Sequence, residues 1–126
     1  MSDQNVRGIR GAIDVPANKS EEILEATREL LQEIMRRNSL DKEQIAAVIF
    51  SMTADLDAVF PAKAARELGW KYVPLFCTNE INVPGSLPRC IRVLMLVNTK
   101  KTAQEIKHVY LRGAVVLRED LLGEDE

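Results

Sequence analysis

The segment "CIRVLMLV" at residues 90–97 has the apolar composition of a buried β-strand, yet it contains a cation, Arg92. Side chains alternate along a strand, and the face that carries Arg92 also carries Cys90, Leu94 and Leu96. An unpaired guanidinium buried on such an apolar face would cost several kcal/mol. The charge of Arg92 is therefore met either by a structural ion pair, for example with Glu80, or by the carboxylate of a ligand.

Other strands and helices are predicted on both sides of this segment. Strand-like runs cover residues 6–13, 46–53, 71–77 and 107–111, and a further run at 114–117 continues the last of these through Arg112 and Gly113. A long helix is predicted from apolar residues at helical spacing, which are Ile23, Leu24, Thr27, Leu30, Leu31, Ile34 and Met35.

Helix boundaries have recognisable signals. Asn18 with Glu21, or Ser20 alone, is predicted to cap the long helix, and Asp41 with Gln44 to start a short one. Pro61 and Gly69 bracket a third helix, and residues 102–106 form one helical turn. There are fewer helices than strands, which favours a mixed five-stranded α+β sheet packed on one face by the long helix. The second face of the sheet must also be buried, and in a chain this short we expect a partner subunit to cover it.

Composition narrows the class of protein. The chain has 126 residues and 46% hydrophobic residues, which suits a single domain spanning 1–126 with a substantial core. A net charge of −2 gives no general attraction to nucleic acid or membranes. There is no apolar signal core and no bilayer-length apolar run, so we expect a cytoplasmic protein. Cys77 and Cys90 lack metal-site spacing, and a single histidine, His108, makes a triad or a histidine-rich metal site unfavourable.

Several further basic or hydrogen-bonding residues lie on elements of buried character. They are Arg10, Lys63, Arg66, Tyr110 and Arg118. Each could simply be solvated, but together with Arg92 they point to a small polyanionic ligand. Cys77 is either a buried thiol or a nucleophile. Glu80 is a general base, an ion-pair partner or an acceptor for a substrate hydroxyl.

Six blocks of sequence match a known family in order and spacing. They are "RGIRGA" (7–12), "DLDAVFPAKAARELGW" (55–70), "YVPLFCTNE" (72–80), "LPRCIRV" (87–93), "HVYL" (108–111) and "AVVLREDL" (114–121). Over about residues 6–121 the chain resembles the monofunctional trimeric chorismate mutases of the pseudo-α/β-barrel type, not the all-helical type. The resemblance implies an isomerase that converts chorismate to prephenate in phenylalanine and tyrosine biosynthesis, without a metal or cofactor.

The resemblance also implies a homotrimer with each active site between two subunits. One subunit would supply Arg10, Phe76, Cys77, Thr78, Asn79, Glu80, Arg92, Tyr110, Leu117 and Arg118. The neighbouring subunit would supply Phe60, Ala62, Lys63 and Arg66. Arg92, Glu80 and Arg10 are expected to carry the catalysis. Arg92 would donate to the ether oxygen, where negative charge develops, and Arg10 and Tyr110 would hold the side-chain carboxylate.

Two alternatives remain open at the level of sequence. A trimeric imine deaminase would also place an arginine and a cysteine between subunits, but its hydrolytic reaction needs an activated water. A non-catalytic module would bind a small anion without turnover. Assay with chorismate distinguishes all three.

Overall fold

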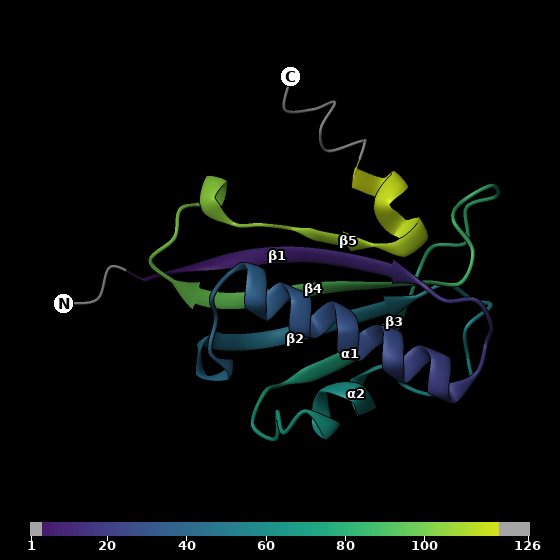
Figure 1. The fold of residues 1–126 in the computed structure, drawn as a ribbon, viewed down its shortest axis with the longest axis horizontal. Coiled ribbons are helices and arrows are strands. Elements are labelled where there is room, and N and C mark those ends of the chain that lie inside the picture. Colours follow the sequence, from purple (N-terminus) through teal and green to yellow (C-terminus); the bar gives the residue numbers. More distant parts are fainter. Residues whose placement is uncertain (1–3, 119–126) are drawn as a thin grey trace.

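The computed structural model describes residues 4–118, so the acidic tail from residue 119 onward lies outside the described part of the chain. Five strands form one sheet, in the spatial order β3-β2-β4-β1-β5 (Figure 1). Their bounds are β1 Asn5–Asp14, β2 Ile45–Met52, β3 Leu75–Asn79, β4 Cys90–Thr99 and β5 Val109–Leu111. β4 is antiparallel to both β1 and β2, whereas the β1–β5 and β2–β3 pairs are parallel. The predicted mixed five-stranded sheet is confirmed.

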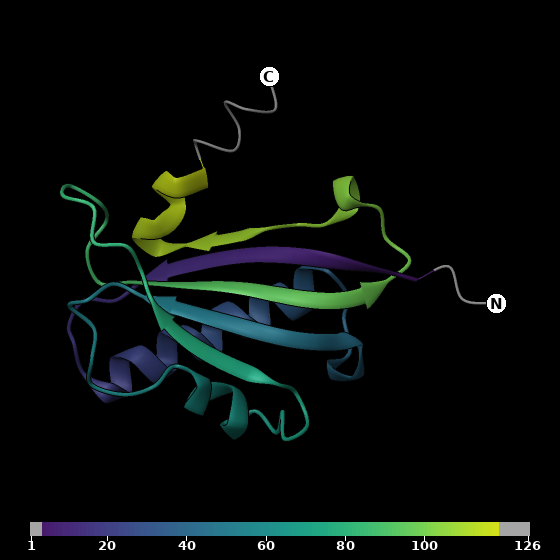
Figure 2. The same ribbon diagram turned by 180° about the vertical axis from the view of Figure 1, so that it is seen from behind.

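The helices lie on one side of this sheet. The long helix α1 (Ser20–Arg37) and the short helix α2 (Ala62–Glu67) cover the face shown towards the viewer in Figure 1. Three 3-10 turns complete the described part: η1 (Lys42–Gln44), η2 (Ala103–Glu105) and η3 (Arg112–Leu117). Figure 2 shows the opposite face, where the strands of the described chain lie in front of the helices. This second face is called the open face below.

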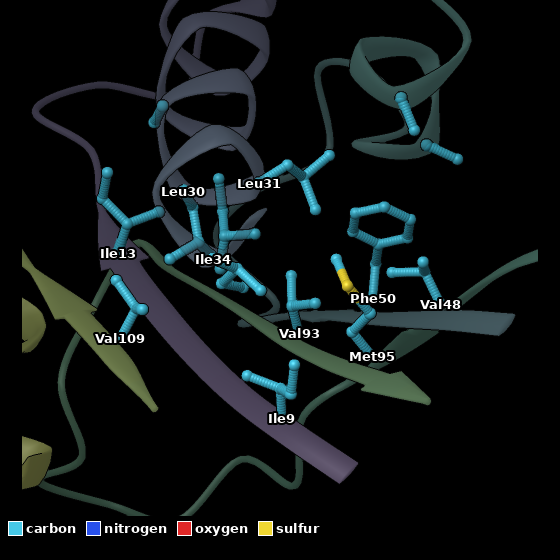
Figure 3. Packing of buried hydrophobic residues seen from close by; sticks show 14 of the residues in the cluster. Ile9, Ile13, Leu30, Leu31, Ile34, Val48, Phe50, Val93, Met95 and Val109 are labelled. Carbon is cyan, nitrogen blue, oxygen red and sulfur yellow. The ribbon is translucent and has the colours of Figure 1, made fainter. Parts of the chain in front are cut away.

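The core lies between the sheet and α1. Leu30, Leu31 and Ile34 of α1 meet side chains from four strands (Figure 3), including Ile13, Phe50, Met95 and Val109. Aliphatic side chains dominate this layer, as the low aromatic content of the sequence indicates. Complete burial of such a side chain contributes about 1.5–3 kcal/mol, so the packing of α1 on the sheet contributes substantially to stability. No helix among residues 4–118 is long and apolar enough to cross a membrane.

The predicted cap of α1 is wrong. Lys19 occupies the N-cap position, and no side chain caps the helix there. Asn18 instead donates to the Asp57 carboxylate at 2.7 Å and accepts the backbone N–H groups of Asp57 and Ala58 at 3.0 and 3.1 Å. The Ser20 hydroxyl donates to the Ala58 carbonyl at 3.2 Å. Both side chains hold a distant loop, which a local capping pattern cannot reveal.

The predicted strand at residues 114–117 is also wrong, because these residues belong to η3. Arg112 has a φ of 53°, which turns the chain sharply after β5. The Asp14 carboxylate then accepts the N–H of Gly113 at 2.9 Å and fixes the first residues of the turn. Ala114 and Leu117 are three residues apart, so both face a small apolar cluster on the open face.

The other boundary signals agree with the structure. The N–H of Asp41 donates to the Gln44 side chain at 2.9 Å at the start of η1. Pro61 is the N-cap of α2, and Gly69 follows this helix with a φ of 87°, a conformation that favours glycine. The turn predicted at 102–106 is η2.

Gly11 provides a test of how closely α1 packs on β1. A methyl group added there would lie 2.8 Å from Ile34 Cδ1 and 3.2 Å from Leu30 Cδ1, both in the packed core. We expect Gly11→Ala to lower the free energy of unfolding by about 1–3 kcal/mol, measured by denaturant titration. Gly8→Ala is the control, since its methyl would lie 3.3 Å from Cδ1 of the exposed Leu94 side chain and 3.8 Å from Leu96 Cδ2. Equal stability of the two variants would contradict this account of the packing.

Candidate active site on the open face

One row of paired residues crosses the open face and brings predicted site residues together. Thr78 pairs with Ser51, Ser51 with Arg92, Arg92 with Ala12, and Ala12 with Tyr110. Side chains of paired residues lie on the same face of a sheet. Five strands therefore present Thr78, Ser51, Arg92 and Tyr110 side by side, with the small Ala12 between the arginine and the tyrosine.

Arg92 lies on this open face, and its charge is paired. The guanidinium Nη1 lies 3.3 Å from Glu80 Oε1, and the Arg92 side chain is 46% exposed. The expectation of a deeply buried guanidinium is thus wrong for the single chain, because neither α-helix of residues 4–118 covers this face. The ion pair proposed as the structural alternative is present, and Arg92 still has exposed area with which to meet a ligand.

Arg10 lies in the neighbouring row, where it pairs with Leu94. Because the rows are offset by two residues along β1 and β4, the two arginines are diagonal neighbours on one face. A depression of about 230 Å³ lies between them. It is lined by Arg10, Gly11, Ile49, Ser51, Glu80, Arg92, Val93, Leu94 and Tyr110.

A hydrogen-bonded loop fixes the start of β4, two residues before Arg92. The Asp55 carboxylate accepts the N–H of Arg89 at 3.0 and 3.2 Å, and the Thr53 hydroxyl accepts the N–H of Cys90 at 3.0 Å while donating to Asp55. Arg89 has a φ of 48°, a conformation unusual for a residue other than glycine. Burial acts to raise the pKa of Asp55, but the hydrogen bonds from Thr53 and Arg89 outweigh it and hold that pKa below its ordinary value.

A second, small apolar cluster supports the end of the site nearest η3. Cys90, Ala12 and Ala114 are buried there, with Leu87, Tyr110 and Leu117 packed against them. Burial raises the pKa of the Cys90 thiol to about 11, although the nearby Arg92 charge acts in the opposite direction. Cys90 is thus a packing residue that steadies Tyr110 and Leu117.

The remaining predicted site residues do not line the depression between Arg10 and Arg92. Phe60, Cys77 and Asn79 border a second depression with residues 56–59, and Thr78 of the open-face row borders it too. Cys77 pairs with Phe50, so its side chain points towards the helix-covered face and not towards Arg92. Phe76 is 66% exposed on the open face, in the row of Ile49, Leu94 and Arg10.

The cations of α2 are separated from Arg92 by the sheet. Lys63 and Arg66 are exposed on this helix, whereas Ala62 is buried against the core of its own chain. α2 packs beside α1 on the face opposite the open face (Figure 1). Arg118 is exposed and is the last residue that the structure describes. A single chain therefore brings together Arg10, Glu80, Arg92 and Tyr110, but not Lys63 or Arg66.

Sequence reasoning missed several residues of this site. Ser51 and Ile49 line the depression because β2 pairs with β4, and no local pattern specifies that register. No local pattern identifies the role of Asp55, because its backbone partner Arg89 lies far away in the sequence and is brought to it by the fold. The sequence indicates no role for His108, whereas in the structure its ring accepts a hydrogen bond from the backbone N–H of Arg10.

The arrangement suits a compact dianion with a hydroxyl group. Two guanidinium groups and a phenol can donate hydrogen bonds to a ligand, and one carboxylate can accept a hydrogen bond from it. Aliphatic side chains also line the depression. The described residues contain no group of three or more histidine, cysteine or acidic side chains arranged to hold a metal ion. The site therefore provides charged side chains at fixed positions around the depression.

Known proteins resemble this chain over most of its length. Residues 6–121 match the family model described as chorismate mutase type I. The chorismate mutase AroH of Bacillus subtilis (strain 168) is 50% identical over 117 residues, which cover 92% of this chain and 92% of the relative. The chorismate mutase AroH of Thermus thermophilus is 54% identical over 117 residues, which cover 92% and 96%. A solved chorismate mutase from Clostridium thermocellum superposes with a TM-score of 0.86 at 53% identity, covering 86% of this chain and 97% of that one.

The buried state of Cys90 predicts slow thiol chemistry. In a Cys77→Ser variant, Cys90 is the only thiol, and its side chain is 3% exposed with a pKa raised to about 11. We expect Ellman's reagent at pH 8 to label the folded variant at least about a hundredfold more slowly than the unfolded one, because few thiolates form and fewer are accessible. The rate should increase as the pH approaches the thiol pKa. Equal rates before and after unfolding would contradict this assignment.

Proposed function

The chain belongs to the chorismate mutase type I family and is an isomerase of aromatic amino acid biosynthesis, and we propose that it works as a homotrimer whose active sites lie between neighbouring subunits. Its reaction is the pericyclic rearrangement of chorismate to prephenate. Family membership at this level of identity leaves the imine hydrolase and the non-catalytic module without support. We also propose that residues 1–126 form one domain and that the protein is cytoplasmic.

The observation that carries the mechanism is the diagonal pair of arginines with Glu80 and Tyr110 around one depression. Chorismate has two carboxylates, a ring hydroxyl and an enol-pyruvyl ether. Its rearrangement breaks the ether C–O bond as a C–C bond forms, and no proton is transferred. Catalysis thus requires a compact reactive conformer held in place and positive charge where negative charge develops.

Each polar group has a proposed task that agrees with its position. Arg92 donates to the ether oxygen, because it stands at the centre of the row and β4 holds its backbone on both sides. Arg10 and Tyr110 bind the side-chain carboxylate. Glu80 balances the charge of Arg92 at 3.3 Å and accepts a hydrogen bond from the ring hydroxyl. A contact of Cys77 with this hydroxyl is not part of the proposal, because its side chain points to the helix-covered face. Leu117 and Arg118 close the end of the site near η3.

The single chain supports the proposed trimer in two ways. Large apolar side chains are exposed on the open face, namely Phe76 (66%) and Leu94 (37%), and in the loop between β3 and β4, namely Ile81 (86%) and Val83 (56%). In addition, α2 lies on the opposite side of the sheet, so its Lys63 and Arg66 must come from another subunit to reach the site. Phe60 and the backbone of Ala62 would enter the site from the same neighbour.

Arg92 should affect the chemical step more than any rim cation. We expect Arg92→Ala to lower kcat by at least about 10²–10³-fold, because a donor aimed at developing charge is lost. Arg92→Lys should also be severely impaired, since an ammonium cannot reproduce the guanidinium geometry. The assay follows chorismate loss by absorbance.

The matched control is Lys63→Ala, which removes a cation from the proposed rim. We expect mainly a higher KM and a stronger salt dependence, with kcat changed much less than in Arg92→Ala. A lysine variant at position 92 with nearly full kcat would refute the proposed role of Arg92.

Shared sites can be tested by mixing inactive subunits. Arg92→Ala and the double variant Lys63→Glu/Arg66→Glu should each have little activity as homotrimers at chorismate concentrations far below KM. Co-refolded at equal ratio, they should recover about a quarter of the wild-type activity, because one pairing in four joins two intact halves. No gain on mixing, with mixed trimers verified by mass spectrometry, would show that each site belongs to one subunit.

A further inference from the structure

We propose that His108 is a positioning residue for Arg10, acting through a hydrogen bond from the backbone of Arg10 to the histidine ring. The backbone N–H of Arg10 donates to Nδ1 of His108 at 2.9 Å. The inference rests on the proposed function, in which Arg10 binds the substrate carboxylate. His108 itself is assigned no contact with the substrate.

The hydrogen bond extends the sheet by one residue at the place where the site needs it. The parallel pairing of β1 with β5 begins at Gly11 and Val109, so Arg10 and His108 are the residues just before the first pair. Here the acceptor for the Arg10 N–H is a side-chain nitrogen. The ring therefore holds the backbone of Arg10 beyond the end of the strand ladder.

The backbone next to His108 is itself held firmly. Asn38, which is 1% exposed, donates to the Lys107 carbonyl at 2.9 Å and accepts the Lys107 N–H at 2.8 Å. Its side chain also donates to the carbonyl of Ile34 at 3.0 Å, at the end of α1. On the other side, Val109 is fully buried in the core. The backbone on both sides of His108 is therefore held in place, and this fixes the position of the imidazole ring.

The hydrogen bond from Arg10 determines which nitrogen of the neutral His108 ring carries the proton. A nitrogen that accepts an N–H carries no proton, so the neutral ring has its proton on Nε2. This nitrogen fixes the direction of the peptide group of Arg10, and the Cα that carries the guanidinium follows from it. Loss of the acceptor should weaken binding of the substrate carboxylate with little effect on the bond rearrangement at Arg92.

Three variants separate this role from general stability. His108→Asn places a carbonyl oxygen near the position of Nδ1 and keeps the acceptor, whereas His108→Leu keeps the bulk and removes it. Lys107→Gln is the matched control, since it changes an exposed neighbouring side chain and leaves the ring in place. Each variant is purified in its native oligomeric state, and its free energy of unfolding is measured alongside KM and kcat for chorismate.

We expect His108→Leu to raise KM about 3- to 10-fold, the range for one lost hydrogen bond, with kcat within about twofold of the wild type. His108→Asn should restore KM to within about twofold, and Lys107→Gln should leave it unchanged. A wild-type KM in His108→Leu, or equal impairment of the leucine and asparagine variants, would overturn the inference while leaving the proposed function intact. Absence of turnover in the wild-type protein would overturn both.

A spectroscopic measurement tests the bond without relying on activity. In the ¹⁵N spectrum of the wild-type protein at pH 7.5, His108 should show an unprotonated Nδ1 and a protonated Nε2. The Arg10 amide proton should move upfield in His108→Leu and stay close to its wild-type position in His108→Asn. A ring protonated on Nδ1 would contradict the inference, even if the leucine variant binds substrate poorly.

Discussion

The antiparallel register between β1 and β4 is the constraint on which both the core and the site depend. It pairs the strands residue by residue from Asn5 with Thr99 to Asp14 with Cys90. On the helix-covered face this alignment places Ile9 beside Met95, within the packed layer. On the open face it places Arg10 diagonally from Arg92. A slip of one residue would exchange the two faces of a strand, so folding and function cannot be separated here.

Local patterns were sufficient to predict the sheet class, α1 and the end of α2. They failed where a side chain was used over a long distance. Asn18 has the right type to cap α1 but binds the loop at Asp57, and residues 114–117 have strand-like composition but form η3, whose start Asp14 holds from the far end of β1. Propensity describes what a segment tolerates, and tertiary partners decide among the tolerated conformations.

The candidate site shows the same division. The pairing of Arg92 with Glu80 could be anticipated from the sequence, because Glu80 directly follows β3 and Arg92 lies near the start of the next strand along the chain, β4. The exposure of the Arg92 side chain could not be anticipated from the sequence. An apolar strand face predicts burial, but it does not indicate which element or subunit covers the face. Leu94 and Leu96 have the composition of core residues, yet neither α1 nor α2 covers their face in the part of the chain that the structure describes.

The open face also has a kinetic consequence for the newly made chain. A monomer that has completed its own core still presents aliphatic and aromatic side chains, among them Phe76 and Leu94, on an ordered sheet. Such a surface associates with whichever complementary surface it meets first, and β3 and β5 add two short unpaired edges. If the chain forms the proposed homotrimer, its assembly depends on concentration and competes with aggregation, so the cellular concentration of the chain sets the yield as well as the rate of assembly.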